Sequence, residues 1–165
     1  MDKRHFIQII NNNRGQIRSL CQLYYVDAED QKDAFQDIVL QLWKSIESFR
    51  GDASPSTWIY RVSLNTILSH KRKNQKTPFT QPIESITEKV SSSFADDNLE
   101  LLPIIIRSLK DMDKAIVILY LEGYQNKEIA ELLKISPSNV GTRFNRIKSQ
   151  LKLKFNQKTH AAKRI

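Results

Sequence analysis

Hydrophobic positions near the C-terminal end of the chain repeat with the period of an α-helix. Four of them follow spacings of four, three and four residues, which places them on one helical face: Val140, Phe144, Ile147 and Leu151. Ser136-Pro137 marks the start of this helix, because Ser is a good N-cap and Pro at the first helical position needs no N–H partner. A shorter apolar pattern over Asn126–Leu133 precedes it. The sequence therefore predicts a helix-turn-helix whose second helix spans residues 137–155.

The remaining apolar positions predict helices in the first half of the chain as well. One pattern covers residues 6–24, with a bend expected near residues 11–13 and Gly15. Asp27 can cap a second helix that ends before Gly51, and acidic residues in its first turns suit the helix dipole. Ser54-Pro55 opens a third helix by the same logic that applies at Ser136-Pro137.

The periodicity fails between residues 74 and 98, where Pro78, Pro82 and three consecutive serines interrupt it. A segment of this length and composition is typical of a linker. Beyond it, Asp111 or Asp113 can cap another helix, which Gly123 ends. The sequence therefore predicts an all-α fold: two small helical domains, residues 1–75 and 98–165, joined by a flexible linker at residues 76–97, the C-terminal domain being the helix-turn-helix.

Charge adds to this picture, because the chain is basic and its Lys and Arg residues are unevenly distributed along it. The 165 residues carry a net charge of +8, with a pI near 9.6. One segment from residue 132 to the end has nine Lys or Arg and no acid, and another from residue 53 to 76 has five and again no acid. Two basic segments separated by acidic ones predict two contacts with a polyanion, although a merely solvated basic surface is the alternative.

Several classes of function are not supported. Cys21 is the single cysteine and is expected in the core, the three His are far apart, and no Gly-rich phosphate loop is present. We therefore expect no enzyme, no catalytic residue, no metal and no cofactor or small-molecule substrate. Neither a signal pattern nor an apolar run of membrane-spanning length appears, so we expect a soluble cytoplasmic protein without direct membrane insertion.

The helix at 137–155 carries the first candidate site. Opposite its apolar face lie small polar side chains, Ser138, Thr142 and Asn145, flanked by Arg146. A helix with an apolar back and such a front fits the major groove of DNA. The alternative is an ordinary helical hairpin whose basic face is only solvated.

Two weaker candidates lie in the first half. Trp58 and Tyr60 stand near Arg61 and Asn65, where aromatic rings could stack on unpaired bases, but a helix buried on both sides explains them equally well. Asp33, Gln36 and Asp37 share one side of a predicted helix. Beside an exposed Trp43 they could meet a basic helix of another protein, or they could simply be solvated.

Taken in order, these segments resemble a known family. Asp33-Ala-Phe-Gln36-Asp37-Ile-Val-Leu-Gln-Leu-Trp43, Phe49-Arg-Gly, Thr57-Trp-Ile-Tyr-Arg61 and Asn65 are similar to the first conserved domain of an extracytoplasmic-function (ECF) sigma factor of the sigma-70 family. Glu122-Gly-Tyr, Lys127-Glu128-Ile-Ala, Leu133-Lys-Ile-Ser136-Pro, Asn139-Val-Gly-Thr and Arg146-Ile resemble its second domain. The resemblance covers nearly the whole chain, and the linker falls where the family has one.

The resemblance implies a sigma factor that directs core RNA polymerase to promoter DNA, helps to open it, and is regulated by an anti-sigma factor. It implies three sets of site residues. The polymerase-binding set is Asp33, Gln36, Asp37 and Trp43. The set for the minus-ten element is Arg50, Gly51, Asp52, Ala53, Ser54, Trp58, Arg61 and Asn65. The set for the minus-thirty-five element is Ser138, Asn139, Thr142, Arg143, Asn145 and Arg146.

Two other classes remain open. A one-component helix-turn-helix regulator would act without docking on polymerase, and its N-terminal domain would sense a ligand or dimerise. An RNA-binding or polymerase-sequestering module would show no preference for a duplex sequence. The combination of residues 33–43 with 57–65 weighs against the first of these.

Overall fold

The computed structural model describes residues 3–49, 51, 53–76 and 103–162, and every described regular element is a helix. In chain order they are α1 (Lys3–Asn12), α2 (Arg14–Tyr24), α3 (Ala28–Lys44), the 3-10 helix η1 (Ile46–Ser48), α4 (Pro55–Lys76), α6 (Asp111–Leu121), α7 (Asn126–Leu133) and α8 (Pro137–Ala162). Residues 103–107 are also helical. The all-α prediction is confirmed, while residues 77–97 of the expected linker lie outside the described residues.

Local signals set most of the helix ends. The expected bend in the first pattern is a break at Asn13 between α1 and α2. Asp27 caps α3, its carboxylate accepting from the N–H groups of Glu29 and Asp30, as the sequence predicts. Gly123 follows α6 with a φ of 89°, in the left-handed region that glycine adopts without strain. These signals act over a few residues, so sequence alone reveals them.

One cap prediction is wrong. Lys110, not Asp111 or Asp113, is the residue before α6, and no side chain caps this helix start. Both aspartates lie in the first turn, where they still suit the helix dipole. The Asp113 side chain instead points into the domain, as described below.

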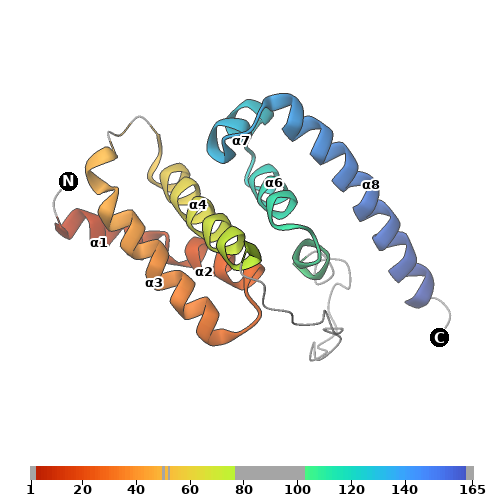
Figure 1. Ribbon diagram of the computed structural model, residues 1–165, viewed down its shortest axis with the longest axis horizontal. Coiled ribbons are helices and arrows are strands. Elements are labelled where there is room, and N and C mark those ends of the chain that lie inside the picture. The colour runs from red at the N-terminus through yellow and green to blue at the C-terminus, as the bar shows by residue number, and fades with distance from the viewer. Residues whose placement is uncertain (1–2, 50, 52, 77–102, 163–165) are drawn as a thin grey trace.

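The N-terminal helices form a bundle in which α3 and α4 pack side by side over α2 (Figure 1). The core residues come from α1, α2, α3 and α4 and include Ile17, Ile38, Leu42, Ile59 and Leu64, all at most 1 % exposed. The aliphatic side chains interlock at the crossings, which holds the helix faces in register.

The C-terminal helices pack around α6, which is buried on nearly all sides and whose residues 115–119 are accordingly all apolar. Ile129 of α7 and Val140 and Ile147 of α8 are fully buried against it. The helix α8 forms the outer edge of this half (Figure 1). Its long front is thereby left away from the N-terminal bundle.

A seam between the two halves runs along α4 and α6 (Figure 1). Across it, the Tyr24 hydroxyl donates to the backbone carbonyl of Asp111 (2.9 Å), and the Lys114 ammonium donates to the carbonyl of Leu23 (3.2 Å). The Lys114 ammonium also lies over the Tyr24 ring, 4.8 Å from its centroid. Burial lowers the pKa of Lys114 below its ordinary value.

A second part of the seam joins the start of α4 to the segment before α7. The hydroxyls of Thr57 and Tyr124 share a hydrogen bond of 3.0 Å. The Tyr124 ring also packs edge-on against Tyr60, with the centroids 6.1 Å apart. The seam therefore ends at the same helix start that the resemblance assigns to promoter DNA.

Replacing Ser63 by Ala should stabilise the fold. Ser63 lies fully buried on α4, and its hydroxyl has no hydrogen-bond partner. Removing an unsatisfied buried hydroxyl, with a small gain in helix propensity, should raise the free energy of unfolding by about 1 kcal/mol. Urea titration followed by circular dichroism measures this, and Ser69→Ala on the half-buried side of α4 is the control for propensity alone. A lower free energy of unfolding for Ser63→Ala would contradict the reading.

Candidate nucleic-acid interface

The turn between α7 and α8 depends on one residue in a left-handed conformation. Lys134 has a φ of 56° and directly follows α7. After it, the N–H of Ile135 donates to the carbonyl of Ala130 (3.1 Å). At the start of α8 the Ser136 hydroxyl accepts from the N–H of Asn139 (3.1 Å), so this cap prediction is confirmed. Together these bonds fix the angle at which α8 leaves α7.

Replacing Lys134 by Gly should stabilise the helix-turn-helix. A left-handed conformation costs a residue with a Cβ roughly 1 kcal/mol, and glycine adopts it freely. We expect the free energy of unfolding to rise by a few tenths to about 1 kcal/mol, since the unfolded glycine chain is also more disordered. Thermal unfolding measures the change. As the matched control, Lys127→Gly within α7 should lower stability by about 1 kcal/mol; equal effects at the two sites would contradict the strain at Lys134.

The helix α8 has the two faces that its sequence predicts. Val140 and Ile147 are fully buried, and Phe144 stacks on Tyr120 with the centroids 3.6 Å apart. The opposite side exposes short polar side chains: Ser138, Asn139, Thr142 and Asn145. An exposed row of small hydrogen-bonding groups on a rigid, well-anchored helix is the form that major-groove reading requires.

Two arginines on this helix share one buried carboxylate. The Asp113 side chain is 4 % exposed, and its Oδ1 and Oδ2 accept from Arg143 Nη1 and Arg146 Nη2 respectively, each at 2.8 Å. Arg143 Nε also donates to Asn139 Oδ1 (2.9 Å). The side chains of Arg143 and Arg146 keep 33 % and 52 % of their surface exposed. The sequence did not reveal this cluster, because Asp113 lies 30 and 33 residues from its partners and no local pattern links them.

The start of α4 forms the second candidate surface. Gly51 has a φ of 82°, and the Ser54 hydroxyl accepts from the N–H of Thr57 (3.1 Å), which confirms the predicted cap. Farther along α4, Arg61 and Asn65 line one polar hollow. Its other walls come from the ends of α3 and α4 and include Gln41, Ser45, Thr66, Ser69, His70 and Lys73. Arg50 and Asp52 lie outside the described residues.

The aromatic residues of α4 are in the core. Trp58 is 7 % exposed and packs against Phe49 with the centroids 4.9 Å apart, and Tyr60 is 5 % exposed. Burial raises the pKa of Tyr60, with Glu122 adding to the shift. Of the two alternatives that the sequence left open for these rings, base stacking or a helix buried on both sides, the structure therefore supports the second. Neither presents a face on which an unpaired base could stack in this structure.

The four residues of the expected docking surface lie on two sides of α3. Asp33 and Asp37 line one hollow, and Asp37 lies 3.7 Å from His70 of α4. Gln36 and Trp43 line an apolar groove on the other side, walled also by Phe6, Phe35, Val39 and Leu40. Trp43 is 43 % and Leu40 46 % exposed. Leu40 was not among the residues predicted for this surface, although it lies outside the helical face that carries the buried residues Ala34, Ile38 and Leu42.

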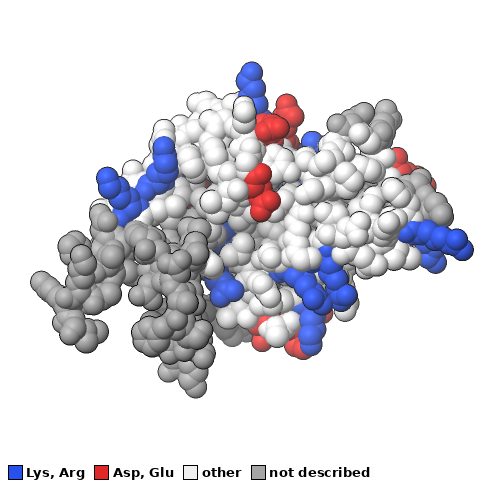
Figure 2. Space-filling model, turned by 180° about the vertical axis from the view of Figure 1, so that it is seen from behind, with Lys and Arg blue, Asp and Glu red and all other residues white. Residues whose placement is uncertain are grey.

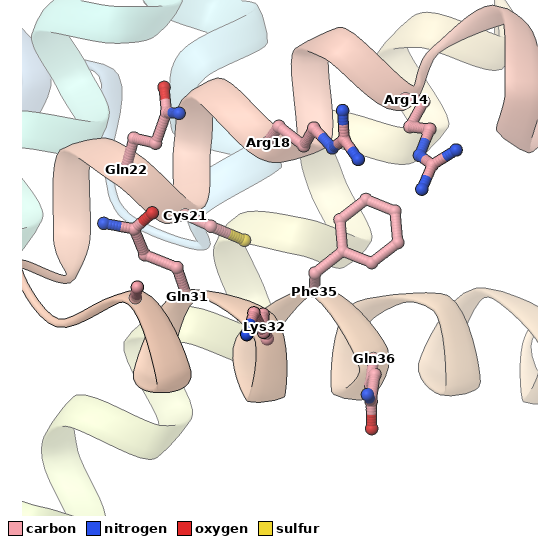
Figure 3. Close-up of a pocket in the computed structure, with 9 residues that line it drawn as sticks. Arg14, Arg18, Cys21, Gln22, Gln31, Lys32, Phe35 and Gln36 are labelled. Carbon is pink, nitrogen blue, oxygen red and sulfur yellow. The ribbon is translucent and has the colours of Figure 1, made fainter.

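A neighbouring groove between α2 and α3 is basic (Figure 3). Arg14 and Arg18 extend from α2 toward Phe35 of α3, and the Arg14 guanidinium lies 5.9 Å from the centre of that ring. Cys21 lies at the same groove, but it is buried as expected, and burial raises the pKa of its thiol to about 11. The thiol is therefore protonated at neutral pH and a poor nucleophile.

Basic side chains lie in separate groups rather than in one continuous stripe on the face shown in Figure 2. Among the described residues, no three His, Cys, Asp or Glu side chains are arranged to hold a metal ion. Within the same part of the chain, no helix has the length and apolar character needed to cross a membrane. Besides the basic groove between α2 and α3, the described surface offers two polar areas with basic side chains, on α8 and along α4, and α6 lies between these two helices (Figure 1).

Two family models match the chain, the first over a part that includes α4 and the second over a part that includes the start of α8. Sigma-70 region 2 matches residues 9–77, and Sigma-70 region 4 matches residues 101–151. The chain is 29 % identical over 157 residues to the ECF RNA polymerase sigma factor SigM of Mycobacterium tuberculosis, covering 91 % of this chain and 76 % of that protein. It is 26 % identical over 165 residues to the ECF RNA polymerase sigma-E factor of Escherichia coli K12, covering 91 % and 86 %.

Solved structures share the fold. The sigma factor RpoE of Bartonella quintana, in complex with the anti-sigma factor NepR, superposes with a TM-score of 0.70 at 16 % identity, covering 90 % of this chain and 95 % of that one. CnrH, in complex with the cytosolic domain of CnrY, gives a TM-score of 0.64 at 16 % identity, covering 94 % and 90 %. The helices described here thus form a fold that has been solved in other chains.

Proposed function

The chain belongs to the sigma-70 family, as a member of the ECF type, and on that premise we propose that it directs core RNA polymerase to specific promoters and helps to open them. The proposed units are an N-terminal domain at residues 1–75, a linker at 76–97 and a C-terminal domain at 98–165. The chain itself catalyses no reaction in this scheme. It acts in the cytoplasm, where the polymerase is.

The observation that carries the proposal is the form of α8. Its buried back and exposed polar front belong to a helix held rigidly by α6 and α7. We propose that Ser138, Asn139, Thr142 and Asn145, with Arg146, read the minus-thirty-five element in the major groove. Arg143 contributes from the flank of the same surface.

The hollow along α4 and the preceding loop are proposed to take the opened strand of the minus-ten element. Extruding a base costs a few kcal/mol, which contacts to the displaced strand must offset. The candidate contacts are Arg50, Gly51, Asp52, Ala53, Ser54, Arg61 and Asn65. Trp58 supports this surface from the core side, because it holds α4 against Phe49.

Docking on core polymerase is proposed for the exposed sides of α3. Asp33 and Asp37 offer negative charge, while Gln36 and Trp43 line the apolar groove. Together they suit a partner helix that carries both basic and apolar side chains. An anti-sigma factor that covers these sides would prevent docking, which is the form of regulation we propose.

The one-component regulator is not favoured, because both family models match in the order of a sigma factor and the match includes the whole of α3 and α4. Nothing in the described residues specifically supports a palindromic site or a ligand-sensing domain.

Reconstitution with core polymerase tests the proposal. The chain is combined with core enzyme, the mixture transcribes a library of randomised promoters, and the transcript start sites are determined by sequencing. Start sites should share two DNA elements at a fixed separation, and they should disappear when either the chain or the core enzyme is omitted. Sequence-selective DNA binding that gives no selective initiation with core enzyme would favour a one-component regulator instead.

A further inference from the structure

The ion cluster of Asp113, Arg143 and Arg146 joins the centre of the C-terminal half to the front of α8. Asp113 is 3 % exposed as a residue, and a carboxylate is seldom buried to this degree unless it has a charged partner. Each of its two oxygens accepts a charge-assisted bond from a different arginine. The carboxylate is fixed in turn by its place in the first turn of α6, a helix buried on nearly all sides.

The two arginines are held unequally. Arg143 makes two bonds, to Asp113 and to Asn139, and keeps 33 % of its side chain exposed. Arg146 makes one bond, through Nη2, and keeps 52 % exposed. A guanidinium has five N–H donors, so Arg146 retains donors that face outward while its position is set from behind. Arg143 serves mainly to connect α8 to α6.

Two physical effects follow. A free arginine side chain has about 2 kcal/mol of rotamer entropy, part of which is lost whenever it is fixed on a partner. The bond to Asp113 removes some of that disorder before DNA arrives, so the bound geometry is formed in advance. In addition, the carboxylate cancels one of the two positive charges, which weakens attraction to any phosphate regardless of sequence.

We infer that Asp113 is a positioning residue for promoter reading: it fixes the guanidinium of Arg146 on the front of α8 and lowers the non-specific attraction of this helix for DNA. This inference rests on the proposed function, and it adds a residue of α6 that does not itself touch DNA. Asp113 thereby favours selectivity between sequences over total affinity. A carboxylate that only fastens α6 to α8 would have no such effect on selectivity.

The test uses Asp113→Asn in holoenzyme reconstituted with core polymerase. Binding is measured to a promoter with an intact upstream element and to the same DNA with that element scrambled, over a series of salt concentrations. The ratio of the two affinities should fall about tenfold, the loss expected when one base-reading contact is misplaced. Affinity for the scrambled DNA should rise, and the slope of log affinity against log salt should steepen by about one unit.

Asp111→Asn is the matched control, because it removes the same charge from the same turn of α6. It should leave the affinity ratio unchanged. In an Arg146→Ala background, Asp113→Asn should cause no further loss of selectivity. Equal affinity ratios for wild type and Asp113→Asn, or a parallel loss on both DNAs, would overturn the inference.

A measurement on the unmodified chain covers the case in which Asp113→Asn does not fold. In NMR spectra of the free protein, the guanidinium N–H signals of Arg143 and Arg146 should be protected from exchange with water, whereas those of exposed Arg61 should not. An Arg146 signal as labile as that of Arg61 would overturn the inference. Failure of the proposed function appears differently, since wild-type holoenzyme would then show no preference for the intact promoter.

Discussion

Replacing both Asp33 and Asp37 with lysine should abolish association with core RNA polymerase. The two carboxylates lie one turn apart on α3 and line the same hollow, so the double substitution changes the charge of one continuous patch from negative to positive. A partner surface that carries basic side chains would then meet like charge, and like charges at an interface cost several kcal/mol. Affinity should therefore fall on the order of a hundredfold or more.

Fluorescence anisotropy or gel filtration with core enzyme measures that loss. The fold should persist, because Asp33 is exposed and the Asp37 side chain is 49 % exposed, and circular dichroism checks it. As a control with the same total change of charge, Glu47→Lys combined with Glu131→Lys alters two exposed residues away from the α3 hollow and should bind core enzyme normally. Unchanged association of the Asp33 and Asp37 variant would remove the docking assignment.

Replacing Arg146 with alanine should greatly reduce transcription from the cognate promoter while association with core enzyme continues. The side chain stands on the front of α8 with 52 % of its surface exposed, and its remaining donors can reach a base edge. A bidentate arginine contact to a base discriminates by about 1 to 3 kcal/mol, so initiation should fall roughly tenfold to a hundredfold. Asp113 keeps Arg143 as its partner, so the fold should survive.

Start-site mapping and quantitative transcription with the reconstituted holoenzyme provide the readout. Lys152→Ala removes one positive charge from the exposed surface of the same helix and should reduce affinity similarly for all DNA sequences. Only Arg146→Ala should relax the preference at one base position. Loss of core association in Arg146→Ala would contradict the role assigned to this residue.

The sequence predicts those parts of the fold that depend on a few neighbouring residues. Caps at Asp27, Ser54 and Ser136 and the end of α6 at Gly123 are local, because each bond spans only a few positions. The helix α7 was predicted with its observed bounds. The helix α8 runs beyond residue 155 to Ala162, because no Gly or Pro interrupts its end.

Features that depend on tertiary packing could not be read in this way. The pairing of Asp113 with two arginines joins residues more than one element apart, and a first-turn aspartate reads locally as a cap. The burial of Trp58 and Tyr60 required knowing that α4 is covered both by the bundle and by the C-terminal half. Similarly, residues 33 to 43 share a helix and a motif, but the neighbours α1 and α4 divide them between two hollows.

The seam between the halves has a mechanical consequence. Its directional bonds run from Tyr24 to a backbone carbonyl, from Lys114 to another, and between the Thr57 and Tyr124 hydroxyls. Water can satisfy each of these polar groups once the halves part, so the bonds themselves cost little to lose, but parting would also expose the buried rings of Tyr24 and Tyr60. Separation of the halves is therefore opposed mainly by the apolar surface that they bury against each other, and a larger assembly that parts them must cover that surface with contacts of its own.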